Sequence, residues 1–329
     1  MHYRKKPFGL NRAYAFAAAA KAEGAELLYF SPGAIDRDRI NGYMYKNGEW
    51  ALTSSHYPDV IYNTAGFTRE KQLEAVEKLQ QSVPFTSYSI GDKETVYNNL
   101  MKYKTFSQYL VPSETVASKK HFFRLLDQYS DIVVKPSSGR QGINVCRVRK
   151  EDGTPDAVLR LIAEEKCIVQ PYINCRTKSG EPYDFRLHVQ KGRGGKWTAP
   201  CIYPRISPDG GIVCNLSRGG YTRDIIPFLQ REFGAEYYSV HKYLEVFSLQ
   251  LAGHLDEIQK DLYGEELDEL GIDAGLDKQL YVYEVNWRPG HPPSGNINLS
   301  IVRNTVRYAI FLAGKEGIMN EKHSVSRFP

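Results

Sequence analysis

Residues 283–290 read YEVNWRPG, and the rest of the chain is best interpreted outward from this stretch. Residues 281–286 predict a buried strand, which Pro289-Gly290 would end. Glu284 and Asn286 are two positions apart, so both side chains leave the same face of that strand. A carboxylate and an amide oxygen placed together suit a hard cation such as Mg²⁺. The stretch predicts a metal site at the end of a strand, although acids on strands are often plain surface residues.

A second acid lies shortly upstream, in the segment GIDAGLD at 271–277. A tight turn near residues 277–279 would bring the strand that carries Asp273 alongside the strand that carries Glu284. Asp273, Glu284 and Asn286 are therefore the predicted metal ligands.

Arginines on polar strands form the next group. The segment DFR places Asp184 and Arg186 on one face, and NLSRGG at 215–220 offers Arg218 ahead of two glycines. Arg205 is a further candidate. Arginine binds phosphate and carboxylate with two parallel hydrogen bonds, which suits a transferring phosphoryl group, although each of these arginines could equally form a surface ion pair. His188 shares the face of Arg186 and is expected to be a packed or surface histidine.

The segment VVKPSSGRQGINV at 133–145 places Lys135 at the end of a strand, before a loop of small residues. Small residues let backbone amides approach phosphate oxygens, and Lys135 adds a positive charge beside them. A Walker A loop is excluded, because there the lysine follows the glycines and opens a helix. The alternative is an ordinary hairpin turn with a surface lysine.

The pattern along the chain changes near residue 90. Before it, helical and strand-like segments alternate, and Asn47-Gly48 predicts the two-residue turn of a hairpin. This order predicts a small α/β domain of the doubly wound type. After it, Asp92 caps a helix expected to run to Leu110, and antiparallel strands and long helices follow, so the whole chain predicts an α/β plus α+β fold. The other expected elements are helices at 12–22, 68–81, 222–233, 236–262 and 297–312 and strands at 25–30, 58–63, 131–136, 143–150, 167–173, 184–191, 197–207 and 211–217.

Composition limits the class of protein. With 329 residues, 42% of them hydrophobic, the chain can bury a sizeable core. It has no apolar run of about 18 residues, so we expect no membrane partner. Its five cysteines stand singly, which is typical of reduced thiols in the cytoplasm. A formal net charge of +5 suits an anionic ligand such as a nucleotide but is too diffuse to indicate nucleic-acid binding.

The order of these motifs resembles the ATP-grasp superfamily from about Lys93 to the last helix, and most of all its YheC/YheD group, described as endospore coat-associated. The first part of the chain resembles the same group in AKAEGAELLYFSPG, in INGY and in PDVIYN. The resemblance implies an ATP-grasp fold with an N-terminal doubly wound α/β (pre-ATP-grasp) domain at 1–90. The ATP-grasp domain would span 91–329, with a lid at about 115–172 and a metal-binding part at about 173–329.

Residue by residue, the resemblance implies that Lys93, in GDK, is the first nucleotide lysine, in preference to Lys102 or Lys104, and that Lys135 is the second. Gln170, Pro171, Tyr172 and Ile173 would form the adenine hinge, which binds mostly through backbone groups, and Gln170 stands where relatives often hold glutamate. The complete set implied for binding ATP is Lys93, Lys135, Ser138, Gly139, Gly142, Gln170, Tyr172, Ile173 and Asp184. Arg186 and Arg218 would be the catalytic clamp, and Asp273, Glu284 and Asn286 would hold Mg²⁺.

The activity implied is ligation of a carboxylate to an amine through an acyl phosphate, with ATP and Mg²⁺ as cofactors and small molecules or peptides as substrates. Such chemistry needs positioning and charge neutralisation more than a protein nucleophile. The chain has no recognisable Ser-His-Asp or Cys-His arrangement, in keeping with this. The alternatives are a small-molecule kinase on the same fold, a non-catalytic spore-layer protein that keeps the fold, and a ligase that modifies peptides. The expected location is the cytoplasm, with spore association implied by the resemblance.

Overall fold

A five-stranded antiparallel sheet forms the centre of the computed structural model, which describes residues 1–64, 70–137, 143–207, 214, 219–290 and 295–325. The strand order is β13-β12-β11-β14-β15. Consecutive strands along this order pair antiparallel. The bounds are β11 Tyr183–Lys191, β12 Trp197–Ile206, β13 Tyr221–Thr222, β14 Glu269–Leu276 and β15 Leu280–Trp287.

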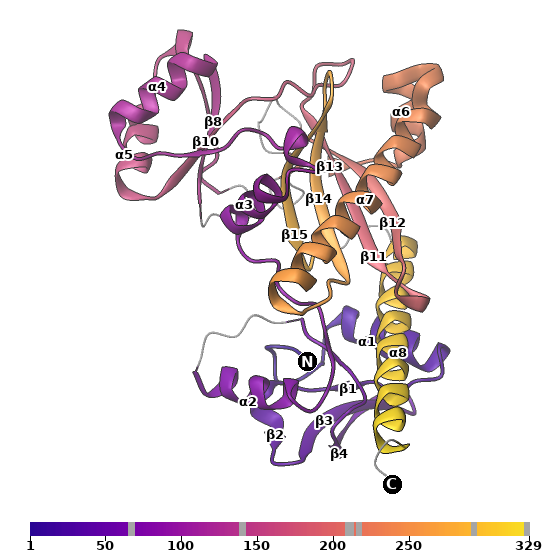
Figure 1. Cartoon of the computed structure of the whole chain (residues 1–329). Coiled ribbons are helices and arrows are strands. Elements are labelled where there is room, and N and C mark those ends of the chain that lie inside the picture. The colour runs from indigo at the N-terminus through magenta and orange to yellow at the C-terminus, as the bar shows by residue number, and fades with distance from the viewer. Residues whose placement is uncertain (65–69, 138–142, 208–213, 215–218, 291–294, 326–329) are drawn as a thin grey trace.

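The two faces of this sheet differ because side chains alternate along each strand. On β11, Phe185 and Leu187 are fully buried, in one core with Leu251 of α7 (Tyr237–Tyr263). Burying side chains of this size stabilises the fold by roughly 1.5–3 kcal/mol each. Asp184 and Arg186 leave the opposite face. The helix α6 (Ile225–Phe233) continues the cover of the apolar face beside α7 (Figure 1).

A second sheet, of order β7-β10-β8-β9, forms a separate unit with two helices beside it (Figure 1). Its elements are β7 Glu114–Thr115, α4 Lys119–Tyr129, β8 Asp131–Pro136, β9 Cys146–Arg149, α5 Asp156–Glu164 and β10 Cys167–Pro171. It has its own core, in which Phe122, Leu125 and Val134 are fully buried. We call this unit the lid.

The helix that begins after Asp92 is shorter than expected. Asp92 caps α3 (Lys93–Tyr103) by accepting a 2.8 Å hydrogen bond from the Thr95 backbone N–H, as the sequence predicts. The prediction that the helix runs to Leu110 is wrong. Lys104 adopts a left-handed conformation with φ of 63°, which ends the helix, and a separate 3-10 turn follows at Ser107–Tyr109.

The amino-terminal part combines two kinds of pairing. The predicted hairpin is present, with Asn47 and Gly48 at φ of 53° and 91° between β3 (Arg39–Lys46) and β4 (Glu49–His56). The doubly wound character is more limited than expected, because only β5 and β6 pair in parallel while the other described strands pair antiparallel. The remaining elements are α1 Asn11–Ala22, β1 Leu28–Tyr29, β2 Ile35–Asp36, β5 Ile61–Tyr62, α2 Glu70–Gln80 and β6 Phe85–Thr86.

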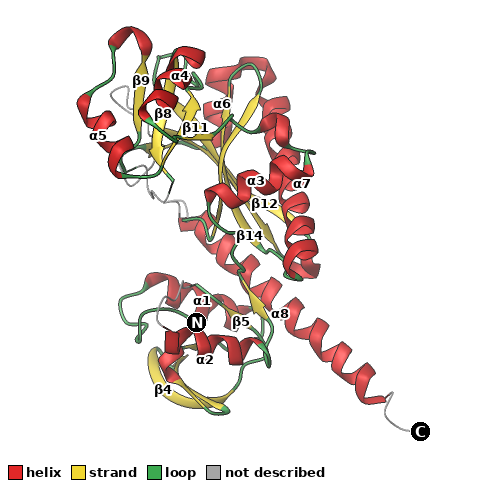
Figure 2. Ribbon diagram, turned by 60° about the vertical axis from the view of Figure 1, so that its left-hand side comes forward, coloured by secondary structure: helices red, strands yellow, loops and turns green. Residues whose placement is uncertain are grey.

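The helix α8 (Gly295–Val325) connects the two large parts and extends past the amino-terminal one (Figure 2). Near the central sheet, Ile301 packs against Cys201 and Tyr203. Farther along, Val302 and Val306 share a small core with Phe16 of α1. The helix therefore ties α1 to the central sheet. The mixed α/β plus α+β class is confirmed, and a domain boundary near residue 90 stays a prediction.

Two further expectations concern the chain as a whole. The strand predicted at 211–217 lies outside the described residues, apart from Cys214. Within the described ranges, none of the helices combines the length and the apolar character that crossing a bilayer requires.

The central core gives a test of the fold. Phe185 is fully buried and packs edge-on against Tyr183 and Phe228, with ring centroids 5.4 and 6.0 Å apart. Phe185→Ala should therefore lower the free energy of unfolding by about 3–5 kcal/mol, measured by urea titration. Leu52→Ala, on β4 at a residue 68% exposed, is the control and should cost under about 0.5 kcal/mol. Equal effects of the two substitutions would contradict this core.

Candidate functional site

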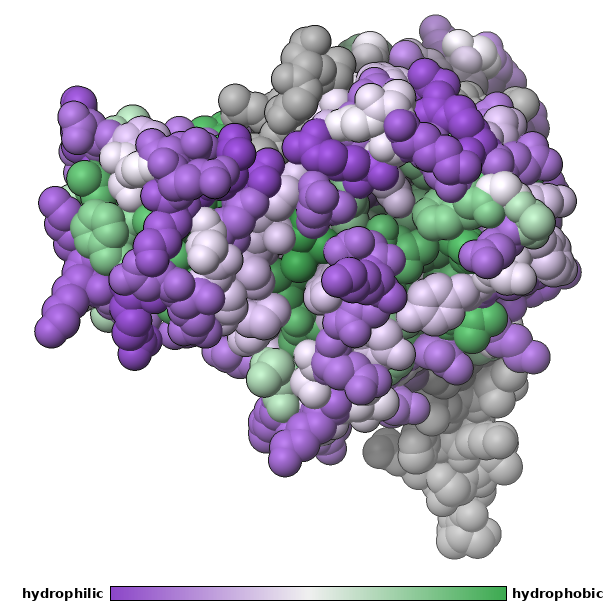
Figure 3. Space-filling view, turned by 90° about the horizontal axis from the view of Figure 1, so that it is seen from above, coloured by the Kyte–Doolittle hydropathy of each residue, from purple (hydrophilic) through white to green (hydrophobic). Residues whose placement is uncertain are grey.

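A pocket lies where α3, the lid strands β8 and β10, and β15 meet. Figure 3, with the lid on the left, shows apolar surface in the groove between the lid and the rest of the molecule. Polar side chains line the pocket, among them Lys93, Lys135, Gln170 and Glu284. Its apolar lining consists of Val96, Leu100, Leu110, Val111, Ile168, Val282 and Val285. The pocket thus offers an apolar slot beside a charged end.

Lys135 brings a positive charge into this pocket from the lid. It is the fifth residue of β8 and pairs in register with Ile168 of β10. Burial lowers the pKa of Lys135 from 10.5 to about 8, Glu284 counters the shift, and Lys93 adds to it. Part of the side chain is still accessible, because the group lines an open pocket. A bound anion would relieve the cost of keeping this ammonium group charged.

Lys93 brings a second positive charge from the first turn of α3. Its Nζ lies 3.2 Å from Oε2 of Glu284, and both side chains are about a quarter exposed, at 26% and 23%. Lys102 and Lys104, the other lysines of this segment, are not among the residues that line the pocket. The structure therefore brings Lys93, Lys135 and Glu284 together from three separate elements.

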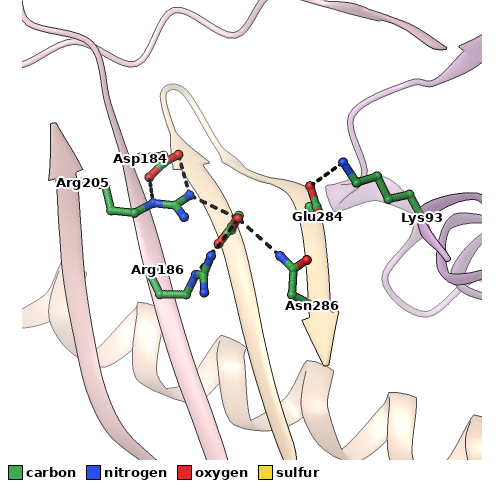
Figure 4. A network of polar contacts seen from close by, with 7 residues as sticks. Lys93, Asp184, Arg186, Arg205, Glu284 and Asn286 are labelled. Carbon is green, nitrogen blue, oxygen red and sulfur yellow. Dashed lines mark hydrogen bonds and ion pairs between the residues drawn. The ribbon is translucent and has the colours of Figure 1, made fainter. Parts of the chain in front are cut away.

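A network of arginines and aspartates lies beside Glu284 on the polar face of the central sheet (Figure 4). Arg186 of β11 binds both carboxylate oxygens of Asp273, with the second contact at 3.2 Å. Arg205 of β12 binds both oxygens of Asp184 at 2.7 and 2.8 Å and also reaches Asp273 at 3.2 Å. Arg205 thus bridges the two aspartates, which is the role that sequence reasoning left undefined.

Opposing effects set the charge of the two aspartates. Burial alone would raise the pKa of Asp273, but Arg186 and Arg205 outweigh it and hold the pKa below the usual range. Burial also raises the pKa of Asp184, and there the attraction of Arg205 does not fully compensate. Asp273 is therefore held as a carboxylate, at the centre of the network.

The predicted metal ligands lie on adjacent strands. Asp273 and Glu284 are direct partners in the β14–β15 register, and the turn at residues 277–279 joins their strands as expected. Asn286 lies on the same side of β15 as Glu284, with its Nδ2 3.5 Å from Oδ2 of Asp273 (Figure 4). Two carboxylates and an amide oxygen suit Mg²⁺ chemically. Within the described ranges, no group of three or more His, Cys, Asp or Glu side chains has metal-binding spacing.

Of the predicted hinge residues, only Gln170 lines the pocket. Its Nε2 donates to the hydroxyl of Ser113. The ring of Tyr172 lies under the guanidinium of Arg147, 3.6 Å from the ring centroid, and its backbone N–H donates to the carbonyl of Asp131 at 2.9 Å. That N–H is therefore engaged within the chain. Ile173 packs against the central core.

Four predicted site residues cannot be placed. Ser138, Gly139, Gly142 and Arg218 lie outside the described residues. His188 is fully buried, with Nε2 3.0 Å from Oε1 of Glu269, in keeping with the expected packed histidine.

Comparisons with known proteins identify relatives of this chain. The family model described as YheC/D like ATP-grasp matches residues 82–312. The endospore coat-associated protein YheD of Bacillus subtilis (strain 168) is 24% identical over 331 residues, covering 89% of this chain and 70% of that protein. YheC of the same organism is 23% identical over 303 residues, covering 81% of each chain.

Solved structures support the same fold. A structure of the ATP-grasp ligase PsnB complexed with minimal precursor gives a TM-score of 0.59 at 12% identity, covering 94% of this chain and 97% of that one. The D-alanine-D-alanine ligase from Coxiella burnetii gives 0.50 at 16% identity, covering 87% and 79%. At these identities the likeness concerns the fold, and it confirms the expected fold class.

The lowered pKa of Lys135 predicts how stability depends on pH. The unfolded chain should bind more protons than the folded one between about pH 8 and 10.5, so Lys135 should make stability rise with pH across that window. Lys135→Met removes this rise, and it should stabilise the protein at pH 7 because it removes a poorly solvated charge. Relative to the variant, the free energy of unfolding of the wild type should rise by about 1–3 kcal/mol between pH 8 and 10.5, measured by urea titration.

Lys119→Met, an exposed lysine on the same lid, is the matched control. Its stability should follow the wild type across the whole window. Parallel curves for Lys135→Met and the wild type would show that the Lys135 ammonium is not poorly solvated.

Proposed function

The chain belongs to the YheC/D-like ATP-grasp family, and on that premise we propose that it is an ATP-dependent ligase that joins a carboxylate to an amine. The observation that carries the proposal is the meeting of Lys93, Lys135 and Glu284 at the charged end of a largely apolar pocket. An apolar slot suits a purine ring, and two lysines beside it suit its phosphates. Gln170 lines the same pocket.

In the proposed reaction, an oxygen of the substrate carboxylate attacks the γ-phosphorus of ATP, and the bond to the ADP oxygen breaks. The product is an acyl phosphate, whose carbonyl carbon is then attacked by an amine. The amine loses a proton, inorganic phosphate leaves, and an amide results. Lys93 and Lys135 would neutralise phosphate charge, and Arg186, which Asp273 holds in place, is proposed to bind the transferring phosphoryl group. Arg218 is proposed for the same task through the family likeness.

Mg²⁺ is proposed as the second cofactor. Glu284, Asn286 and Asp273 would hold it, and it would supply charge neutralisation between the phosphates when bound. In the structure, cations of the chain neutralise both acids, Lys93 at Glu284 and two arginines at Asp273. Among the residues that the structure describes, Glu284 forms an ion pair with Lys93 alone, so it is the ligand best placed to exchange its partner for a metal.

The setting of the reaction is proposed from the cysteines of the chain and from the names of two relatives. Two of them are named as endospore coat-associated proteins. We propose that this chain works in the cytoplasm, which suits its five single cysteines, and that it associates with spore layers in a spore-forming cell. Small-molecule and peptide acids and amines are both admitted as substrates.

The test is an acyl-phosphate trap. The protein is incubated with Mg²⁺-ATP and a panel of amino acids, dipeptides and cell-extract metabolites, with hydroxylamine added to intercept acyl phosphates as hydroxamates. We expect ADP and a hydroxamate with the correct acid, and an amide when a suitable amine replaces hydroxylamine. Glu284→Gln should lower the rate by on the order of 100-fold or more.

Glu257→Gln, on α7 with its side chain 84% exposed, is the matched control and should leave the rate unchanged. A stable phosphorylated product without hydroxamate or amide would show that the protein is a kinase and would contradict the proposed ligase activity. No thermal shift with Mg²⁺-ATP would instead indicate a non-catalytic protein.

A further inference from the structure

The polar face of the central sheet continues past the metal-ligand candidates toward the amino-terminal part of the molecule. By alternation, Glu269 of β14 leaves the same face as Asp273, and Arg288 directly follows the last residue of β15. The amino-terminal part approaches the sheet here, since Tyr62 of β5 donates to Oε2 of Glu269 at 3.3 Å. This end of the face has no role in the proposed handling of ATP.

Arg288 is held in place there by contacts that include no carboxylate within ion-pair distance, although Asp268 and Glu269 lie near enough to attract its charge. It is a non-glycine residue at φ of 51°, directly after β15, and its guanidinium lies 3.7 Å over the ring of Trp287. Its Nη2 donates to the carbonyl of Ser87 at 3.3 Å. Among the residues that the structure describes, its buried Nε has no hydrogen-bond partner, and no ion pair neutralises the group.

A second arginine points into the same region. Arg12 of α1 donates to the hydroxyl of Tyr62 at 3.0 Å, and within the described ranges it too forms no ion pair. It lies close enough to Arg288 for their charges to repel. The nearby acid Glu269 already has other partners, since its Oε1 lies 3.0 Å from Nε2 of His188 and 3.2 Å from Nε2 of Gln190, and its Oε2 accepts from Tyr62.

We propose that Arg288, assisted by Arg12, binds a second carboxylate of the acid substrate, one that does not react. The proposal rests on the proposed function, because it places this group next to the carboxylate that ATP activates. Arginine is planar and matches a carboxylate with two parallel hydrogen bonds. Asp268, which accepts from the Ser87 backbone N–H at 2.7 Å, and Glu269 are close by, and they favour a singly charged anion over a phosphate dianion.

The spacing also limits the size of the substrate. The α-carbons of residues 286 and 288 lie roughly 7 Å apart, because Trp287 between them is the last residue of the extended strand β15. A molecule that reaches from the metal-ligand end to Arg288 therefore carries its two carboxylates a few carbons apart. Dicarboxylic acids and acidic amino acids of that length form the substrate class.

Glutarate is the probe, and valerate, with the same five carbons but a single carboxylate, is its matched control. Calorimetric titrations are run on the full chain with saturating Mg²⁺-ADP. Glutarate should bind the wild type measurably more tightly than valerate. Arg288→Gln should weaken glutarate binding by about 10- to 100-fold and leave the weaker valerate binding unchanged. Arg12→Gln, at an exposed helix position, should weaken glutarate binding by a smaller factor.

Arg303→Gln, an exposed arginine on α8 paired with Glu23, controls for loss of positive charge and should bind glutarate like the wild type. Equal binding of glutarate and valerate to the wild type, or unchanged glutarate binding in both Arg288→Gln and Arg12→Gln, overturns the proposal. If Arg288→Gln fails to fold, Arg12→Gln decides alone. Binding of Mg²⁺-ADP is measured first, and its absence would count against the proposed function instead.

Discussion

The register of three antiparallel strands is the constraint on which the rest of the structure depends. Arg186 of β11 stands opposite Asp273 of β14, and Asp273 stands opposite Glu284 of β15. The alternate residues Phe185, Leu187 and Ile272 fill the core beneath. A slip of one residue would move every one of these side chains to the other face. The same apolar packing that stabilises the sheet therefore also aligns the charged groups.

The charges on this face hold one another in place. Arg205 binds Asp184 and Asp273 together, so the network would lose both contacts if that one arginine were removed. Breaking a buried pair typically costs about 3–5 kcal/mol, because the remaining charge is left without a partner. The pocket itself is shared among elements, with Lys135 contributed by the lid and Lys93 by α3. Site assembly therefore depends on how the lid is placed against the central sheet.

The sequence predicts local features well and long-range ones poorly. The strand with Glu284 and the cap at Asp92 follow from alternation and side-chain chemistry, and the Asn47-Gly48 turn follows from turn propensity. The early end of α3 does not, because the left-handed conformation of Lys104 has no strong sequence signal. Nor could the role of Arg205 be predicted, since it depends on the β11–β12 register and on a partner 21 residues away. The engaged N–H of Tyr172 likewise depends on tertiary contacts.

The central claim is that Mg²⁺ and ATP are bound together at Glu284, and calorimetric titration with ATP tests it most directly. The affinity of the wild type is measured with Mg²⁺ and with a chelator, and both titrations are repeated with Glu284→Gln. We predict that Mg²⁺ raises the affinity of the wild type at least about 10-fold and that the variant loses this gain while still binding free ATP. An equal gain in both proteins, or no binding of ATP to the wild type, would contradict the account.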